Sequence, residues 1–489
     1  MKKKFYSLVT LGIFLYSMHS YSQKNVVVVE PDEGINIGAL NEAISSGDTT
    51  GNTIYELRRG GLYLLNGAIS HTGYHLHIRA EDGKGPRPVL QPAADELGNS
   101  DRHFNPGGSL TLEGLYLQGQ GELGAIDKRT IVVSGDSNRI VLDNCFADYS
   151  EQTIVRLTSS HNSVYILNSI IRNSIRPENP GNGRVVDTRS NPTDTVVIEN
   201  STIYNCSSAI IRMGGGFTNY VKLNHNTIYQ TGYNRSVNLQ VALEADITNN
   251  IFYNFGYAAN DSWHGVLFWA DSMYTYGDYT DADRKFDFSN NNFFIEQEIV
   301  DIINEYSPDT LYRFSDEDSL QLDTIPYSYI PRTYLFANEE VLNDQDTDID
   351  PPALINFIAN GQVDTSNIFM ESLEFRNPPP LNLDYWKFYT KNNYEIRGAN
   401  PPNPYADEDT LILGEVQTGA YDFSYDSDSR SATAAEGGLP LGDPRWMSTG
   451  TVSSENVVNL SNIEVKAYPN LFGGNVTFEF QSEESTNVR

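Results

Sequence analysis

The sequence predicts an all-β fold, a right-handed parallel β-helix (a solenoid) with a short N-terminal capping helix and a small C-terminal β element. Three observations predict it. One stretch repeats every two dozen residues or so, each repeat has the apolar pattern of strands, and the chain contains 30 Tyr, 22 Phe and 38 Gly but few helical runs. A solenoid can use most of a 489-residue chain as one body.

The repeat is clearest between residues 139 and 294. Six segments share an apolar residue, any residue, a polar residue and then, two residues later, another apolar one. Their polar positions are separated by 24, 32, 25, 24 and 41 residues. The consensus leucines and the helical half of a leucine-rich repeat are missing, so a parallel β-helix is favoured. We expect the polar column to form a structural ladder of stacked side chains inside the turns, with His225 as one of its members. The column comprises Asn144, Asn168, Asn200, His225, Asn249 and Asn290.

The N-terminal part of the β-helix is predicted to begin with a short helix at 40–44. This helix would cover the open first coil and hide strand edges. Strands are expected at Thr53–Leu57, Leu62–Leu65 and 74–79, and an earlier coil at 110–114.

Domain boundaries follow from composition. Residues 1–22 have a basic start, an apolar run and small residues before Gln23, the pattern of a secretory signal peptide. The β-helix domain is assigned to 23–423, with long Pro-rich and acidic loops from about 296 onward. Residues 424–462 have the composition of a linker, and 463–489 form a separate β element.

Charge and hydropathy indicate a protein that works outside the cell, secreted or at the cell surface. The formal net charge is −31, which argues against generic binding to nucleic acid or to anionic membranes. The apolar run of the signal is too short to span a membrane, and no later segment is long enough. We expect a monomer.

The two cysteines, Cys145 and Cys206, lie two coils apart by the repeat. Strands of neighbouring coils are about 4.8 Å apart, so their backbones should be roughly 10 Å apart. A disulfide needs Cα atoms within about 7 Å, and we therefore expect two free, buried thiols.

A second column contains arginines. Arg156, Arg189 and Arg212 lie 12, 11 and 13 residues before Asn168, Asn200 and His225, so we expect them on one face of three successive coils. Such a basic stripe on an acidic body could attract an anionic chain. The alternative is that each arginine pairs with a neighbouring carboxylate, such as Asp187 or Glu199.

Two further regions are weaker candidates. Asp344, Asp346 and Asp348 alternate as Ca²⁺ ligands can, but Ile349 stands where an EF-hand loop needs glycine, so a solvated acidic loop is favoured. Trp263 and His264 belong to an aromatic-rich insertion that could form the wall of a sugar subsite or pack over the coils.

A family resemblance rests on residues 209–215, Ala-Ile-Ile-Arg-Met-Gly-Gly, and on 220–226, Tyr-Val-Lys-Leu-Asn-His-Asn. They resemble the Arg-x-Gly coil of the pectin-lyase-like chondroitinase B and alginate lyase group, polysaccharide lyase family six. The resemblance implies that Arg212 matches the catalytic arginine and that Arg189 stands in place of the catalytic lysine. Asn182-Gly183-Arg184 stands where the family has acidic calcium ligands.

The same resemblance implies the reaction, β-elimination on an acidic, uronate-containing polysaccharide. A cation neutralises the uronate carboxylate, a base removes the C5 proton and the 4-linked group leaves. Tyr165, Tyr233, Lys222 and His225 are the candidate bases. The expected substrate-binding residues are Arg156, Lys222, His225, Tyr233, Trp263 and His264. The alternatives are a non-catalytic glycan-binding surface protein or adhesin, and a glycoside hydrolase, which would need clustered carboxylates.

The C-terminal element carries a second resemblance. Tyr468-Pro469-Asn470-Leu471-Phe472, followed by the strand-like 475–480, is similar to the opening of the C-terminal sorting domain of the type IX secretion system. Leu471 replaces the second proline of that pattern. The resemblance implies that the type IX machinery is a partner.

Overall fold

The computed structural model describes most of the β-helix region and two strands near the C-terminus. The described residues are 24–33, 37–121, 123–231, 236–255, 268–270, 273, 275–306, 310–314, 322–326, 360–391, 401–405, 421–447, 463–469 and 476–482. The chain divides into two compact units, Met1–Met447 and Ser448–Arg489.

The first unit contains three parallel sheets, here called A, B and C. Sheet A has, in spatial order, β1 Asn25–Val29, β2 Thr53–Leu57, β5 Leu76–Ala80, β8 Leu110–Glu113, β11 Arg139–Asp143, β14 Asn162–Leu167, β17 Thr193–Glu199, β20 Thr218–Asn224, β23 Ala242–Thr248, β28 Lys285–Asp287 and β32 Val363–Asp364. Sheet B has β3 Leu62–Leu65, β6 Val89–Pro92, β9 Tyr116–Gln118, β12 Phe146–Ser150, β15 Ile170–Ser174, β18 Thr202–Cys206, β21 Thr227–Thr231, β24 Ile251–Phe255, β29 Asn291–Phe294 and β33 Ile368–Phe369. Sheet C has β4 Ile69–Thr72, β7 Phe104–Gly107, β10 Arg129–Val133, β13 Thr153–Leu157, β16 Arg184–Asp187, β19 Ile211–Arg212, β22 Val237–Gln240 and β25 Phe268–Ala270.

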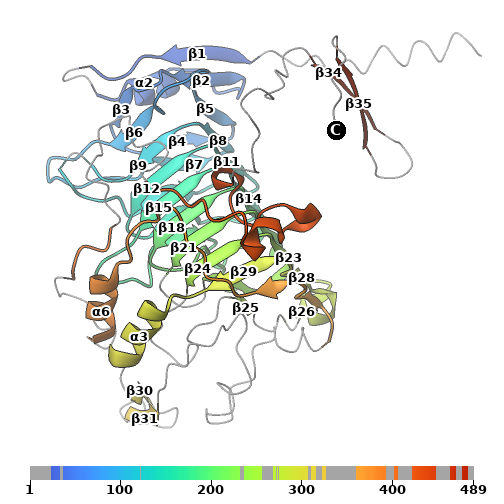
Figure 1. The fold of residues 1–489 in the computed structure, drawn as a ribbon. Helices are drawn as coiled ribbons and strands as arrows, with labels where there is room; N and C mark the ends of the chain where they lie inside the picture. Colours follow the sequence, from blue (N-terminus) through green and yellow to red (C-terminus); the bar gives the residue numbers. More distant parts are fainter. Residues whose placement is uncertain are drawn as a thin grey trace, which may run out of the picture. The chain divides into compact units, whose positions relative to one another are not determined.

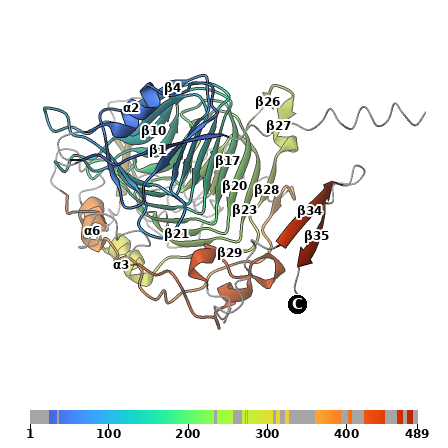
Figure 2. The ribbon, with the colours of Figure 1, turned by 90° about the horizontal axis from the view of Figure 1, so that it is seen from above.

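This arrangement is a parallel β-solenoid of about eight turns, so the predicted fold class is confirmed. In each full coil the chain passes from sheet A to sheet B to sheet C before it returns to A. Figure 1 shows the strands stacked coil upon coil. In Figure 2, β10 of sheet C, β17 of sheet A and β21 of sheet B lie on different sides of the core.

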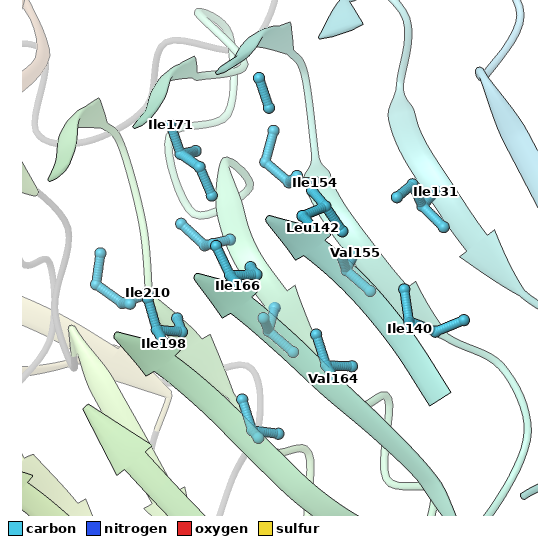
Figure 3. Packing of buried hydrophobic residues seen from close by; sticks show 14 of the residues in the cluster. Ile131, Ile140, Leu142, Ile154, Val155, Val164, Ile166, Ile171, Ile198 and Ile210 are labelled. Carbon is cyan, nitrogen blue, oxygen red and sulfur yellow. The ribbon is translucent and has the colours of Figure 1, made fainter. Parts of the chain in front are cut away.

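Columns of aliphatic side chains fill the interior. In sheet A, Leu112, Leu142, Ile166, Ile198 and Leu223 are in register on consecutive strands, and all are fully buried. Figure 3 shows three of them beside buried residues from the other sheets. Each such side chain contributes about 1.5–3 kcal/mol by leaving water, so the stacked column is a main source of stability.

The predicted polar column lies in the two-residue turn between sheets A and B. All six of its residues have left-handed backbone conformations, with φ between 50° and 62°. This conformation favours asparagine among non-glycine residues. The column is therefore a turn element, as expected, and His225 is one of its members with φ 52°.

The prediction that this column forms the internal ladder is wrong by one residue. Asn144 and Asn168 are exposed, and Asn200 Nδ2 lies 3.4 Å from Asn168 Oδ1. The continuous ladder is made by the following residue of each turn, whose side chain accepts a hydrogen bond from the backbone N–H one coil before it at 2.9–3.0 Å. Its buried members are Cys145, Ser169, Ser201, Asn226, Asn250 and Asn291.

The N-terminal cap is confirmed as helix α2, Ala39–Ser45. Leu40 and Ile44 are buried in the solenoid core, and the Ala39 N–H donates to Asp32 Oδ1 at 2.9 Å. The helix therefore packs on the first coils through one apolar face.

The later part of the first unit covers the outer face of sheet B. Helices α3 Gln297–Tyr306 and α6 Leu383–Lys391 and the short 3-10 helices η1 Asp281–Asp283, η2 Arg430–Thr433, η3 Glu436–Gly438 and η4 Pro444–Trp446 belong to this part or to connections before it. Tyr204, Tyr229 and Tyr253 of sheet B form one buried cluster with Phe375 and Phe423. Sheet B is thus closed to solvent along much of its length.

For residues 424–447 the linker prediction is wrong. Ser431, Leu441 and Asp443 are buried, and Asp443 Oδ2 accepts a hydrogen bond from Thr202 Oγ1 at 2.6 Å. The Trp446 indole also donates to Thr202 Oγ1 at 2.6 Å. Small and acidic residues gave this segment the composition of a linker, but these contacts with sheet B hold it in place.

Two smaller points concern the remaining elements. Cys145 and Cys206 are free and buried, which confirms the expectation. Antiparallel hairpins are formed by β26 Thr275–Tyr276 with β27 Tyr279–Thr280, by β30 Thr310–Phe314 with β31 Leu322–Pro326, and, in the second unit, by β34 Ile463–Pro469 with β35 Val476–Ser482. Of the helices in the described part, none has both the length and the apolar character needed to cross a bilayer. The predicted signal peptide lies outside the described residues.

Candidate functional site

The site is built on sheet C, where Arg156 and Arg212 share one column. Strand pairing places Arg156 of β13 beside Asp187 of β16, and Asp187 beside Arg212 of β19. The preceding residues Val155, Val186 and Ile211 are fully buried in the core. Because side chains alternate along a strand, the column that contains Arg156, Asp187 and Arg212 belongs to the outer face of sheet C.

Arg189 does not belong to this column, which corrects the prediction. It lies two residues after Asp187, in the turn between sheets C and A, with φ 54° and an exposed side chain. The equal spacing of 11–13 residues before the A–B turn was misleading because the C–A turns differ in length from coil to coil. Arg189 nevertheless remains in the site, since its N–H donates to Asp187 Oδ1 at 3.2 Å.

Sequence reasoning missed two arginines of the site and the role of its carboxylate. Arg129 and Arg184 begin strands β10 and β16 and are aligned through Thr153 of the strand between them. Each stands three residues before a position of the Arg156 column, Val132 or Asp187, and this spacing is the signal that could have identified them. We call Arg129, Arg156, Arg184, Arg189 and Arg212 the arginine cluster.

Asp187 is the carboxylate at the centre of the cluster. Its side chain is fully buried, and its oxygens lie 3.2 Å from Arg212 Nη1 and 3.5 Å from Arg184 Nη1. The Arg212 side chain stays 34% exposed while it makes this contact. Asp187 therefore fixes the guanidinium group of Arg212 and leaves part of it open to a ligand.

Glycines allow the Arg212 turn to pack on the Arg189 turn. A Cβ at Gly216 would come within 2.5 Å of the Ser190 carbonyl carbon, and one at Gly214 within 2.7 Å of Ser190 Oγ. The Ser190 hydroxyl donates to the Gly214 carbonyl. These close approaches bring the two turns together only because the positions lack side chains.

The cluster has an excess of positive charge. Burial lowers the pKa of Arg156 to about 10, and the charges of Arg129, Arg189 and Arg212 lower it further against the opposing effect of Asp187. Burial likewise lowers the pKa of Arg184 to about 10, in spite of Asp187. Five guanidinium groups thus share one carboxylate, in a chain whose net charge is −31.

The other predicted site residues are not brought to sheet C. Lys222 lies on β20 of sheet A, where its Nζ pairs with Glu199 Oε1 at 2.8 Å, and His225 lies in the A–B turn. Tyr165 is also a sheet A residue. Outside the described residues lie Tyr233, Trp263, His264, Asp344, Asp346 and Asp348.

This arrangement can hold anions rather than cations. Guanidinium groups bind carboxylate and sulfate oxygens through paired N–H donors. A calcium or transition-metal site needs several acidic or imidazole ligands, and within the part of the chain that the structure describes no three His, Cys, Asp or Glu residues form such a group. No protein-family model matches the chain, and no curated protein matches it.

Proposed function

We propose that this protein acts outside the cell and binds an acidic, uronate-containing polysaccharide along sheet C. The observation that carries the proposal is the arginine cluster, with its five cations around one buried carboxylate. Strands β10, β13, β16 and β19 are consecutive in sheet C, so the cations recur at steps of about 4.8 Å along the solenoid axis. A regularly charged chain laid along that axis would meet a cation at each step.

The electrostatic cost of the cluster supports a ligand-binding role. Like charges held together and partly buried oppose folding unless an anion compensates them. The chain has 64 acidic residues that could have supplied partners. A bound polyanion would supply the missing negative charge and would gain from the low dielectric of the partly buried face.

Cleavage by β-elimination is the second candidate function, and it rests on the resemblance to polysaccharide lyase family six. In that reaction Arg212 would neutralise the uronate carboxylate, with Arg189 beside it in the neighbouring turn. Arginine is a poor general base because it keeps its proton. No described strand of sheet C carries a lysine or a tyrosine, and for this reason binding is the first proposal and cleavage the second.

The C-terminal unit supports a proposal on export. Its β34–β35 hairpin begins with the segment that resembles a type IX sorting domain. We propose that the N-terminal signal and this unit direct the protein to the cell surface or medium. Deletion of residues 448–489 should then leave the protein inside the producing cell envelope, and export without this unit would contradict the proposal.

The test of the main proposal compares Arg212→Ala with the wild type on five substrates: alginate, chondroitin sulfate, dermatan sulfate, pectate and ulvan. Binding is measured by retention on an immobilised polymer, and cleavage by the ultraviolet absorbance of unsaturated uronates. Arg212→Ala should weaken binding by about tenfold or more, because a charge-assisted contact is worth about 1.5–3 kcal/mol.

Arg376→Ala is the matched control, since Arg376 also pairs with a single aspartate, at 3.4 Å, and its side chain is 77% exposed. Both variants should keep the wild-type melting temperature within about 1 °C, because exposed ion pairs contribute at most about 1 kcal/mol. Binding without absorbance would establish the non-catalytic function. If none of the five polymers is retained by the wild type, the proposal is wrong.

A further inference from the structure

A second pocket lies at the corner where the chain turns from sheet C to sheet A. It has a volume of about 400 Å³, which is large enough for one or two sugar rings. His161, Asp194 and Phe217 line it from three successive coils, and Asp278 and Tyr279 line it from the β26–β27 hairpin. Figure 2 shows this hairpin projecting beside strands β17, β20 and β23. None of the arginine cluster belongs to its lining.

The hairpin is held firmly enough to serve as a fixed wall. Arg284, fully buried at its base, donates to the carbonyl oxygens of Ala242 at 2.7 Å and Gln240 at 2.9 Å. The same guanidinium group pairs with Asp281 at 3.2 Å, and Asp281 Oδ1 accepts the Met273 N–H at 2.8 Å. These bonds tie both ends of the insertion to the coils, so the pocket is formed before any ligand arrives.

One wall of the pocket is aromatic. The rings of Phe217 and Tyr279 are stacked with centroids 5.6 Å apart and planes inclined by 15°. Phe217 is buried, whereas Tyr279 is 43% exposed. A half-exposed ring supported from behind by a second ring offers a flat apolar face to a ligand.

The polar edge of the pocket consists of hydrogen-bond acceptors. His161 Nδ1 lies 3.2 Å from Asp194 Oδ1, and a carboxylate only accepts, so this nitrogen carries the proton. In the neutral ring Nε2 is then an acceptor. Asn219 Nδ2 also donates to Asp194 Oδ1, at 3.4 Å, which leaves its amide oxygen as an acceptor, and Asp278 adds an exposed carboxylate.

We propose that this corner pocket binds a neutral sugar ring. A row of acceptors with two carboxylates suits a ligand that offers hydroxyl donors and carries no negative charge, and the Tyr279 ring suits the apolar face of a pyranose. The pocket would repel the uronates that the arginine cluster attracts. The two surfaces therefore recognise different ligands, and this inference does not rest on the proposed function.

The experiment measures binding of the β-1,4-linked hexasaccharides of glucose, mannose, galactose and xylose to the full chain by isothermal titration calorimetry. At least one should bind the wild type. Tyr279→Ala should weaken that binding about tenfold, the worth of an aromatic contact of roughly 1.5 kcal/mol, and Asp194→Asn should weaken it to a similar degree. Leu97→Ala removes an equally exposed apolar side chain elsewhere and should change nothing.

Arg212→Ala separates the two proposals, because it should leave hexasaccharide binding unchanged even if it abolishes binding to acidic polymers. Melting temperatures of the variants, expected within about 2 °C of the wild type, confirm that each is folded. The inference is overturned if none of the four hexasaccharides binds, or if binding survives in both Tyr279→Ala and Asp194→Asn.

Discussion

Replacement of Asp187 by asparagine is the sharpest test of the arginine cluster. The substitution keeps the shape of the side chain and removes the one negative charge that Arg184 and Arg212 contact at 3.5 and 3.2 Å. Asp187 is fully buried, so water cannot replace the lost charge. Removal of one partner from a buried ion pair costs about 3–5 kcal/mol, and we expect a loss near the lower limit because Arg212 can turn toward solvent.

The assay is thermal unfolding, followed by circular dichroism or calorimetry. An unfolding entropy of about 2 cal/mol/K per residue, over roughly 400 residues, converts 3 kcal/mol into a fall of about 3–4 °C in the melting temperature. The control is Asp82→Asn, at an exposed turn position, which should shift the midpoint by less than about 1 °C.

A second measurement connects the loss of stability with ligand binding. An acidic polymer that binds the native cluster should raise the melting temperature of both proteins, and more so for Asp187→Asn, because the cluster then lacks its internal anion. Equal melting temperatures for the wild type and Asp187→Asn would show that Asp187 does not hold the cluster together, and the reasoning would fail.

Three further predictions concern the scaffold. Asn250→Ala should cost about 2–4 kcal/mol in urea unfolding, because it removes a buried ladder amide, whereas Asn168→Gly, at an exposed left-handed turn position, should stay within about 1 kcal/mol of the wild type. Burial, aided by nearby cations, lowers the pKa of His75 from 6.5 to about 4. The unfolded chain therefore binds more protons, and the contribution of His75 to stability, about 2 kcal/mol for a partly exposed ring, is present above pH 6.5 and is lost between pH 6.5 and 4; His75→Gln should flatten this part of the stability–pH curve. Cys145 and Cys206 should not react with a thiol reagent at pH 8 until the protein unfolds, because burial raises the pKa of each thiol to about 12, and reaction of the native protein would contradict their burial.

The period of the polar column was sufficient to predict the fold, because each coil must return a buried strand to the same register. It did not determine which of two adjacent turn residues points inward. Asn168 and Ser169 are both polar, and asparagine suits a left-handed turn as well as a buried ladder. Only the pairing of backbone N–H groups with side chains one coil later distinguishes the two columns.

The site was predictable to the extent that strand register follows from sequence spacing. Arg156 and Arg212 were placed correctly on one face, whereas Arg189 was not, because the distance to the next turn includes a C–A turn of variable length. The role of Asp187 follows from its burial among arginines, which depends on three coils at once. The contact of Thr202 with Asp443 joins residues 241 positions apart, and no local pattern reveals it.

The contrast between sheets B and C argues that the arginine cluster is selected for binding. The outer column of sheet B contains Tyr204, Tyr229 and Tyr253, and later segments of the chain cover it. A similar cover over sheet C would bury guanidinium groups without enough carboxylates, at a cost of several kcal/mol each. In the described part of the chain one buried aspartate contacts two of the five arginines, although acidic residues outnumber basic ones 64 to 33. A scaffold that needed only stability would have paired or replaced these cations. Their persistence on one face is therefore best explained by an anionic ligand.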